Sequence, residues 1–231
     1  MKHLKEHLRN LNRIERKSYH PLIHEIHKNY AISHNTLFYI KEYGPHSNVP
    51  KTIIRESLKI LLLASLIDTF GGLAVERVKD AFLSLLPLVI LLPTLNDLLG
   101  DFATIVSGRF STMLHEGVVG KSWSQSKPLR KLLAQILIVA LFTGTLASSA
   151  ALIISMLKGY ALGYLLVVKI FFVVLADVAL LVTILFFLTV VTGLYFYKRR
   201  EDPNNFLITI TTSVADFGNM IILAVLVSIF F

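Results

Sequence analysis

Residues 165–197 read LLVVKIFFVVLADVALLVTILFFLTVVTGLYFY, and this stretch decides the class of fold. Lys169 and Asp177 are its only charged residues. A helix that crosses the ~30 Å hydrocarbon core of a bilayer needs about 20 mostly apolar residues. The run exceeds that length, so it can tilt or project from the bilayer. It therefore predicts a transmembrane helix.

The composition of the whole chain agrees with this interpretation. Of 231 residues, 54% are hydrophobic and 16% are charged, against roughly 25% charged in an ordinary soluble domain. A soluble enzyme does not fit these values. The sequence has no Cys, which excludes disulfides, thiolate metal sites and Cys nucleophiles. The net charge is +8, but most basic residues flank apolar runs, so we expect no nucleic-acid partner.

Further apolar runs on both sides predict an all-α, polytopic protein with about five transmembrane helices in the lipid bilayer. One predicted span begins near Asp80 and continues to Met113, which is too long and too polar at its end for a simple span. Pro87 and Pro93 each remove a backbone donor there, so we expect a kinked or broken helix. The other predicted spans are 57–76 and about 131–157, 165–197 and 205–230.

The basic residues orient these spans. Ten Lys and Arg precede the first span, and more lie near 109–131 and at 198–200, which alternate spans place on the same side. Arg77, Lys79, Lys158 and Lys169 fall on the opposite side. The positive-inside rule then predicts a cytoplasmic N-terminus and an external C-terminus in the cell membrane.

Residues 1–56 form a separate, basic cytoplasmic tail in this interpretation, and 57–231 form the transmembrane domain. Apolar residues at helical spacing within 1–30 predict a basic helix. It either lies on anionic lipid headgroups or packs under the membrane part as a regulatory element. His20, His24 and His27 share one face of that helix and are interpreted as solvated or structural, with metal binding as the alternative.

The predicted spans also contain acidic residues, and an ionisable residue inside a membrane is costly enough to be a functional candidate. Asp68 and Asp216 fall near mid-bilayer, whereas Asp97 and Asp101 share one face of the second span beside Asn96. No Lys or Arg lies deep enough to pair with most of them. Their charge must then be compensated by a cation, removed by protons or solvated in a water-filled cavity.

Carboxylate and amide oxygens suit hard cations such as Mg²⁺, which keeps much of its water when it binds to protein. We interpret Asp216 and Asp101 as ion contacts, and we leave Asp97 and Asp68 open between ion contact and a structural role. Asp177 is interpreted as a helix-packing acid. The third span carries Gly144, Ala147, Ser148 and Ala151 instead of acids, and these small residues favour close helix packing.

Two segments resemble the MgtE-like magnesium transporters, especially their eukaryotic solute-carrier branch. LPTLNDLLGDFATIVSGRFST (92–112) matches the family motif P-x-L-x-x-x-x-G-N-x-x-x-x-x-x-x-R-x-S-T at Pro93, Gly100, Arg109, Ser111 and Thr112. DPNNFLITITTSVADFGNMIILAVL (202–226) matches N-P-D-N-x-x-x-P-I-x-x-S-x-x-D-L-x-T at Pro203, Asn205, Ser213 and Asp216. The first span, LLLASLIDTFGGLAVE, is weakly similar to L-L-A-G-L-x-x-x-F-A-G.

The resemblance implies a divalent cation channel or transporter whose pore lies on the two-fold axis of a homodimer. It implies that the second and fifth spans line the pore and that Asp216 is the central Mg²⁺ ligand. The family Asn after Gly100 is Asp101 here. Thr212, one helical turn before Asp216, and Asn96 would add neutral oxygens. The candidate metal ligands are thus Asp216, Asp101, Asp97, Asn96, Asp68 and Thr212, with Mg²⁺ as the transported ion and no organic cofactor.

Three other functions remain as alternatives. A proton-coupled carrier could use Asp68 and Asp177 as proton relays. An intramembrane aspartyl protease could use Asp101, because Leu99-Gly100-Asp101 partly matches its G-x-G-D motif, but the first Gly of that motif is missing. In a membrane scaffold that transports nothing, the acids would only take part in helix packing.

Overall fold

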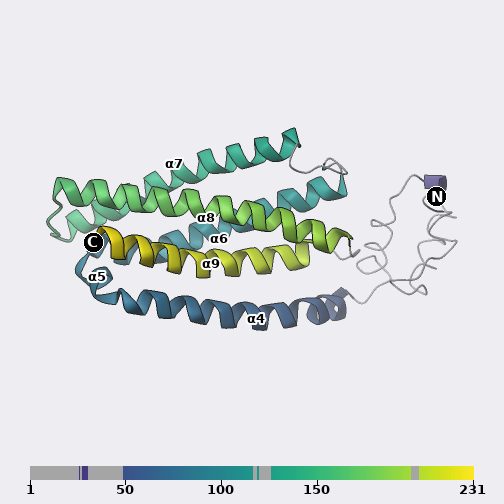
Figure 1. The fold of residues 1–231 in the computed structure, drawn as a ribbon, viewed down its shortest axis with the longest axis horizontal. Helices are drawn as coiled ribbons and strands as arrows, with labels where there is room; N and C mark the ends of the chain where they lie inside the picture. The colour runs from purple at the N-terminus through teal and green to yellow at the C-terminus, as the bar shows by residue number, and fades with distance from the viewer. Residues whose placement is uncertain (1–25, 27, 31–48, 117–118, 120–125, 199–202) are drawn as a thin grey trace.

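The computed structural model describes residues 26, 28–30, 49–116, 119, 126–198 and 203–231 (Figure 1). These residues contain no strand, so the all-α prediction is confirmed. The predicted tail helix over 1–30 lies almost wholly outside the described residues, as do His20, His24 and His27. The described elements are α4 (Val49–Arg77), α5 (Lys79–Ser84), α6 (Leu86–His115), α7 (Lys127–Leu157), α8 (Tyr164–Lys198) and α9 (Pro203–Phe230).

Four helices in the described part of the chain are long and apolar enough to cross a membrane: α6, α7, α8 and Phe206–Phe230 of α9. They correspond to the second to fifth predicted spans. The predicted first span, 57–76, lies within α4. Leu62, Leu66 and Phe70 of α4 are exposed, and such a face suits contact with lipid.

The predicted second span is broken near its start. The short helix α5 ends at Ser84, and Leu85 has non-helical backbone angles (φ −115°, ψ 86°) before α6 begins. Pro87 lies in the first turn of α6. Backbone N–H groups in the first turn have no acceptor within the helix, so the missing N–H of Pro87 costs no hydrogen bond there. Pro93 lies inside α6, which continues through it to His115. The break therefore lies at Leu85.

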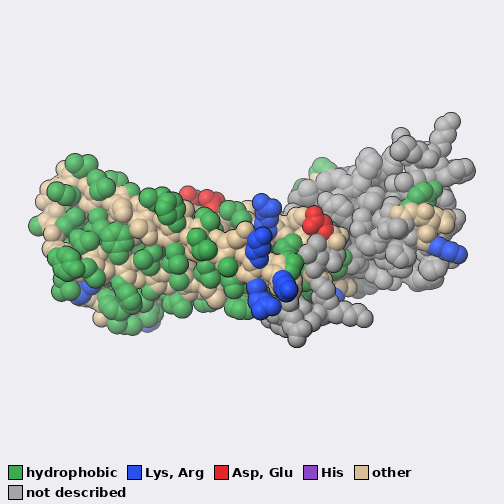
Figure 2. Space-filling view, turned by 90° about the horizontal axis from the view of Figure 1, so that it is seen from above, with side chains coloured by type: hydrophobic (Ala, Val, Ile, Leu, Met, Phe, Trp, Pro, Cys, Tyr) green, Lys and Arg blue, Asp and Glu red, His purple; other side chains and the backbone are tan. Residues whose placement is uncertain are grey.

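The long helices alternate in direction along the bundle (Figure 1). Helix α9 packs against α4, α6 and α8, and α7 packs against α6 and α8. The ends of α6 and α8 lie at the same end of the bundle as the starts of α4, α7 and α9. Figure 2 shows Lys and Arg gathered in a band near one end of the described bundle, with apolar side chains over most of the rest. The membrane part is thus a polytopic bundle with α9 among its central helices.

The small residues of the third predicted span, α7, lie partly in the bundle core, where Gly144 faces α8. Gly144, Ser148 and Ala151 are buried on α7. A Cβ atom added at Gly144 would lie 3.5 Å from Val178 of α8, an ordinary van der Waals distance. The Ser148 hydroxyl donates to the Gly144 carbonyl at 2.9 Å, so its proton is satisfied within the helix.

Gly193 of α8 marks a closer contact. A Cβ atom built there would lie 2.6 Å from Cε1 of Phe110 on α6 and 3.1 Å from Leu207 of α9. Real Cβ atoms essentially never approach another heavy atom so closely. Phe110 is fully buried, so its ring has little room to move away. Gly193 is therefore required for the packing of α6, α8 and α9.

Gly193→Ala should destabilise the protein by about 1 kcal/mol, because overpacking of about 2 kcal/mol exceeds a gain of about 1 kcal/mol in helix propensity. Thermal unfolding in detergent should then show a lower Tm. Gly72→Ala is the matched control, since a Cβ atom there meets nothing within 4 Å. An unchanged Tm for Gly193→Ala would contradict the packing described here.

Candidate functional site

A cavity of about 500 Å³ opens along α6 and α9. Nearly all of its lining side chains are small or carry oxygen, which is unusual for the surface of a membrane helix. Six of the residues come from α6 and two from α9. They are Pro93, Asn96, Asp97, Gly100, Asp101, Thr104, Thr212 and Asp216.

Helical periodicity places these residues on common faces. On α6 the lining positions recur at intervals of three or four residues, so they form one stripe along the helix. Asp97, Asp101 and Thr104 are exposed on this stripe. Thr212 and Asp216 lie one turn apart on α9. Because α6 packs directly against α9, the two stripes meet and form one polar cavity.

A chain of two hydrogen bonds holds Asp216 in place. Nδ2 of Asn219, which is fully buried, donates to Oδ1 of Asn96 at 2.9 Å. Nδ2 of Asn96 in turn donates to Oδ1 of Asp216 at 2.7 Å. The amide of Asn96 has one oxygen and one NH₂ group, so accepting from Asn219 turns its NH₂ towards Asp216. The relay fixes both the position and the direction of this contact.

A second polar contact joins the same helices outside the cavity. The hydroxyl oxygens of Ser107 on α6 and Thr211 on α9 are 2.8 Å apart, and both residues are buried. Thr211 donates its proton to the Leu207 carbonyl at 2.7 Å. Ser107 is therefore the donor to Thr211, because a hydroxyl has one proton. Polar contacts thus tie α6 to α9 at two levels.

Negative charge is concentrated around Asp216. The carboxylates of Asp68 and Asp97 are near enough to repel that of Asp216 when all are ionised. Asp68 does not line the cavity, and its buried Oδ1 has no hydrogen-bond partner. Lys79–Glu76 is the one ion pair found in the described part of the chain. The described residues thus supply no cationic side chain that neutralises these acids.

The described residues of one copy do not form a complete chelating site. Within the ranges that the structure describes, no group of three or more His, Cys, Asp or Glu side chains could hold a metal ion. The carboxylates of the cavity are spread along two helices. Such an arrangement suits an ion that keeps its water, or one that is shared with ligands from elsewhere.

The structure brings five of the six predicted ligands into this cavity: Asn96, Asp97, Asp101, Thr212 and Asp216. Asp68 is the exception. Sequence reasoning missed Thr104 as a lining residue and Asn219 as a partner of Asn96. Both could have been found from helical spacing, since Thr104 follows Asp101 by one turn and Asn219 follows Asp216 by one turn.

Asp177 is separate from this cavity. It is fully buried on α8, and neither of its carboxylate oxygens has a hydrogen-bond partner. Its position in the packed core agrees with the interpretation of a helix-packing acid. It also gives a control position: an acid in the same bundle that does not line the cavity.

The hydrogen bond between Asn96 and Asp216 should appear as an energetic coupling. In a double-mutant cycle of Asn96→Ala and Asp216→Ala, we expect a coupling of about 1 kcal/mol, as for hydrogen bonds between membrane helices. Equilibrium unfolding in detergent measures it. Thr104→Ala with Asp216→Ala is the control pair, because Thr104 donates to the Gly100 carbonyl. Equal coupling in both cycles would contradict the relay.

The comparisons with known proteins agree with this geometry. The family model described as MgtE, divalent cation transporter, matches residues 92–226, from the start of the α6 stripe through most of α9. No curated protein and no solved structure matches the chain. The matched family consists of transporters and not enzymes, so the intramembrane protease is excluded. The match covers more than half of the sequence, and the chain therefore belongs to the MgtE family of divalent cation transporters, as a multi-pass membrane protein.

Proposed function

We propose that this transporter carries Mg²⁺ and that the ion passes along the α6–α9 cavity with Asp216 as its central contact. The observation that carries the proposal is the convergence of five oxygen-bearing candidate residues in one open cavity. Among the described carboxylates of the cavity, Asp216 is held in place by a hydrogen bond from Nδ2 of Asn96 to its Oδ1. No described residue donates to its other oxygen, which could contact the ion or a water of its hydration shell.

The ligand chemistry favours a hydrated Mg²⁺ ion. Mg²⁺ dehydrates reluctantly and is usually held through one or two carboxylates and several waters. The cavity offers carboxylates at Asp97, Asp101 and Asp216 without a compact cluster of three acids. Negatively charged side chains that line a pore attract cations, and the ion remains free to move on when each contact is weak.

A homodimer would complete this site. Asp97, Asp101 and Thr104 are exposed on a transmembrane helix, and such groups are costly against lipid tails. Two copies related by a two-fold axis would bring their α6–α9 cavities face to face, since a two-fold interface uses the same patch on both subunits. Two Asp216 carboxylates would then flank one water-filled path.

The membrane potential would drive the ion inward along this path. A divalent ion gains roughly 4.6 kcal/mol for each 100 mV of inside-negative potential. Passive flow through a pore would therefore favour import.

Asp216→Asn should lower Mg²⁺ uptake by at least about ten-fold, equivalent to about 1.4 kcal/mol or more of lost stabilisation of the ion. The reason is that both central carboxylates lose their charge while the side-chain shape is kept. The measurement is uptake into proteoliposomes loaded with a Mg²⁺-sensitive dye under an imposed inside-negative potential. Asp177→Asn is the control and should transport Mg²⁺ as the wild type does.

Equal uptake by Asp216→Asn and wild type would remove Asp216 from the ion path. Loss of uptake in Asp177→Asn alone, together with a dependence on a proton gradient, would favour the proton-coupled carrier instead. The absence of Mg²⁺ uptake by folded wild-type protein would contradict the choice of ion.

The homodimer can be tested by cross-linking, because the chain has no native Cys. Thr104→Cys places a thiol on the exposed stripe of α6 that lines the cavity, so oxidation in the membrane should give a covalent dimer. Val168→Cys is the control, since Val168 is exposed on α8 and does not line the cavity. Cross-linking of Val168→Cys without that of Thr104→Cys would place the interface on another face.

A further inference from the structure

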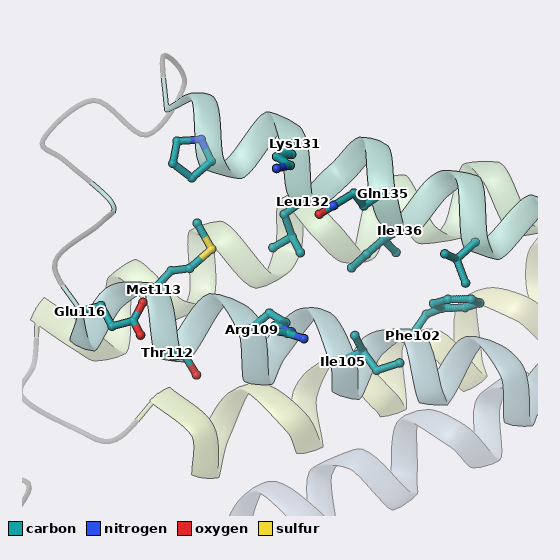
Figure 3. Close-up of a pocket in the computed structure, with 12 residues that line it drawn as sticks. Phe102, Ile105, Arg109, Thr112, Met113, Glu116, Lys131, Leu132, Gln135 and Ile136 are labelled. Atoms are coloured by element: carbon teal, nitrogen blue, oxygen red, sulfur yellow. The ribbon is translucent and has the colours of Figure 1, made fainter.

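A second cavity, of about 620 Å³, lies between α6 and α7 and belongs to neither the acidic cavity nor the relay. Figure 3 shows side chains from both helices facing the space between them. Those of α6 include Phe102, Ile105 and Arg109, and those of α7 include Lys131 and Ile136. A divalent cation would be repelled by Arg109 and Lys131, so transport of the family's ion does not explain this basic cavity.

On both helices the charged residues of the lining lie towards one end of the cavity. On α6, Phe102 and Ile105 precede Arg109, Thr112 and Glu116 towards the end of the helix. On α7 the order is reversed, because the helix runs the opposite way: Lys131 comes near its start, with Ile136 and Val139 further in. The polar part therefore lies at the basic end of the bundle, and the apolar part lies towards its middle.

No carboxylate in the described part of the chain forms an ion pair with the two cations of this cavity. These cations, Arg109 and Lys131, are exposed. Glu116 lies at the outer edge, beyond Met113 in Figure 3. With its charge included, the lining carries a net charge of +1. The cavity therefore favours an anion at its polar end.

We propose that this cavity binds an anionic phospholipid. Its phosphate would lie between Arg109 and Lys131, where an Arg fork can hold two phosphate oxygens. The first carbons of its acyl chains would cover Phe102, Ile105 and Ile136. Basic pockets between transmembrane helices are suited to such headgroups, because they combine charge with an adjoining apolar surface.

The apolar half of the cavity favours a lipid over a free phosphate ion. Ile105 and Val139 are 49% and 50% exposed, and they border the cavity on transmembrane helices surrounded by bilayer. An inorganic phosphate would use the polar end alone and leave this surface uncovered. A phospholipid matches both halves, with its headgroup at the membrane interface and its chains in the hydrocarbon core.

Native mass spectrometry of the delipidated full-length protein in detergent can test the proposal. Phosphatidylglycerol and phosphatidylcholine with identical acyl chains are the probes. We expect phosphatidylglycerol to bind at least about five-fold more tightly than phosphatidylcholine. This is the effect of one net positive charge on an anionic headgroup, since each basic residue contributes about 1 kcal/mol. Arg109→Gln combined with Lys131→Gln should lower the affinity for phosphatidylglycerol by about thirty-fold, because two such contributions are lost.

Two further variants separate this site from general surface charge. Lys127→Gln combined with Arg130→Gln removes the same charge from exposed positions on α7 that do not line the cavity, and its affinity should change by less than about three-fold. Val139→Trp should fill the apolar half and weaken binding of both lipids without a change in charge.

Three results would overturn the proposal. Equal losses in the two double variants would indicate diffuse attraction to the basic end. Displacement of phosphatidylglycerol by millimolar inorganic phosphate, with no effect of Val139→Trp, would indicate a phosphate site instead. A shift from dimer to monomer in the Arg109 and Lys131 variant, without a change in lipid affinity, would assign the cavity to a second copy of the chain.

Discussion

The rest of the structure depends on one constraint: polar groups inside a bilayer must find partners within the protein. The contact between α6 and α9 meets it with the relay from Asn219 through Asn96 to Asp216 and with the bond from Ser107 to Thr211. These bonds set which faces of the two helices meet. Asp97, Asp101 and Thr104 of α6 are thereby turned to one side, where they line the acidic cavity.

Helix α8 packs against both α6 and α9 and so stabilises their contact. Gly193 lets Phe110 of α6 pack closely against it, and Gly218 of α9 faces Leu181 of α8, whose Cδ1 atom would lie 2.6 Å from an added Cβ. Shape therefore fixes the distance between the helices, and hydrogen bonds fix their rotation. A dense core of this kind resists small displacements, so the spacing of the cavity-lining oxygens is set by apolar packing several residues away from them.

Much of this arrangement could be predicted from the sequence, because long apolar runs, Pro positions and isolated acids are local signals. They predicted the helices and the three acids of the cavity, and the family resemblance added Asn96 and Thr212. The break at Leu85 could not be placed exactly, since two nearby Pro residues were equally good candidates and Pro93 is accommodated inside α6. Asn219 could have been placed near Asp216 from helical spacing, but its hydrogen bond to Asn96 depends on how α6 and α9 meet. Asp68 also carried the right chemistry, but helix packing keeps it out of the cavity lining.

The separation of these partners along the chain affects how the protein is made. Asn96 and Asp216 are 120 residues apart, and synthesis at about 5–20 residues per second takes roughly 6–24 s to cover that distance. During this interval α6 has left the ribosome and α9 has not, so the amide of Asn96 has neither of its final partners. The insertion machinery, water or neighbouring lipid headgroups must satisfy it. Biogenesis of this bundle therefore includes a waiting state, which ends when α9 arrives.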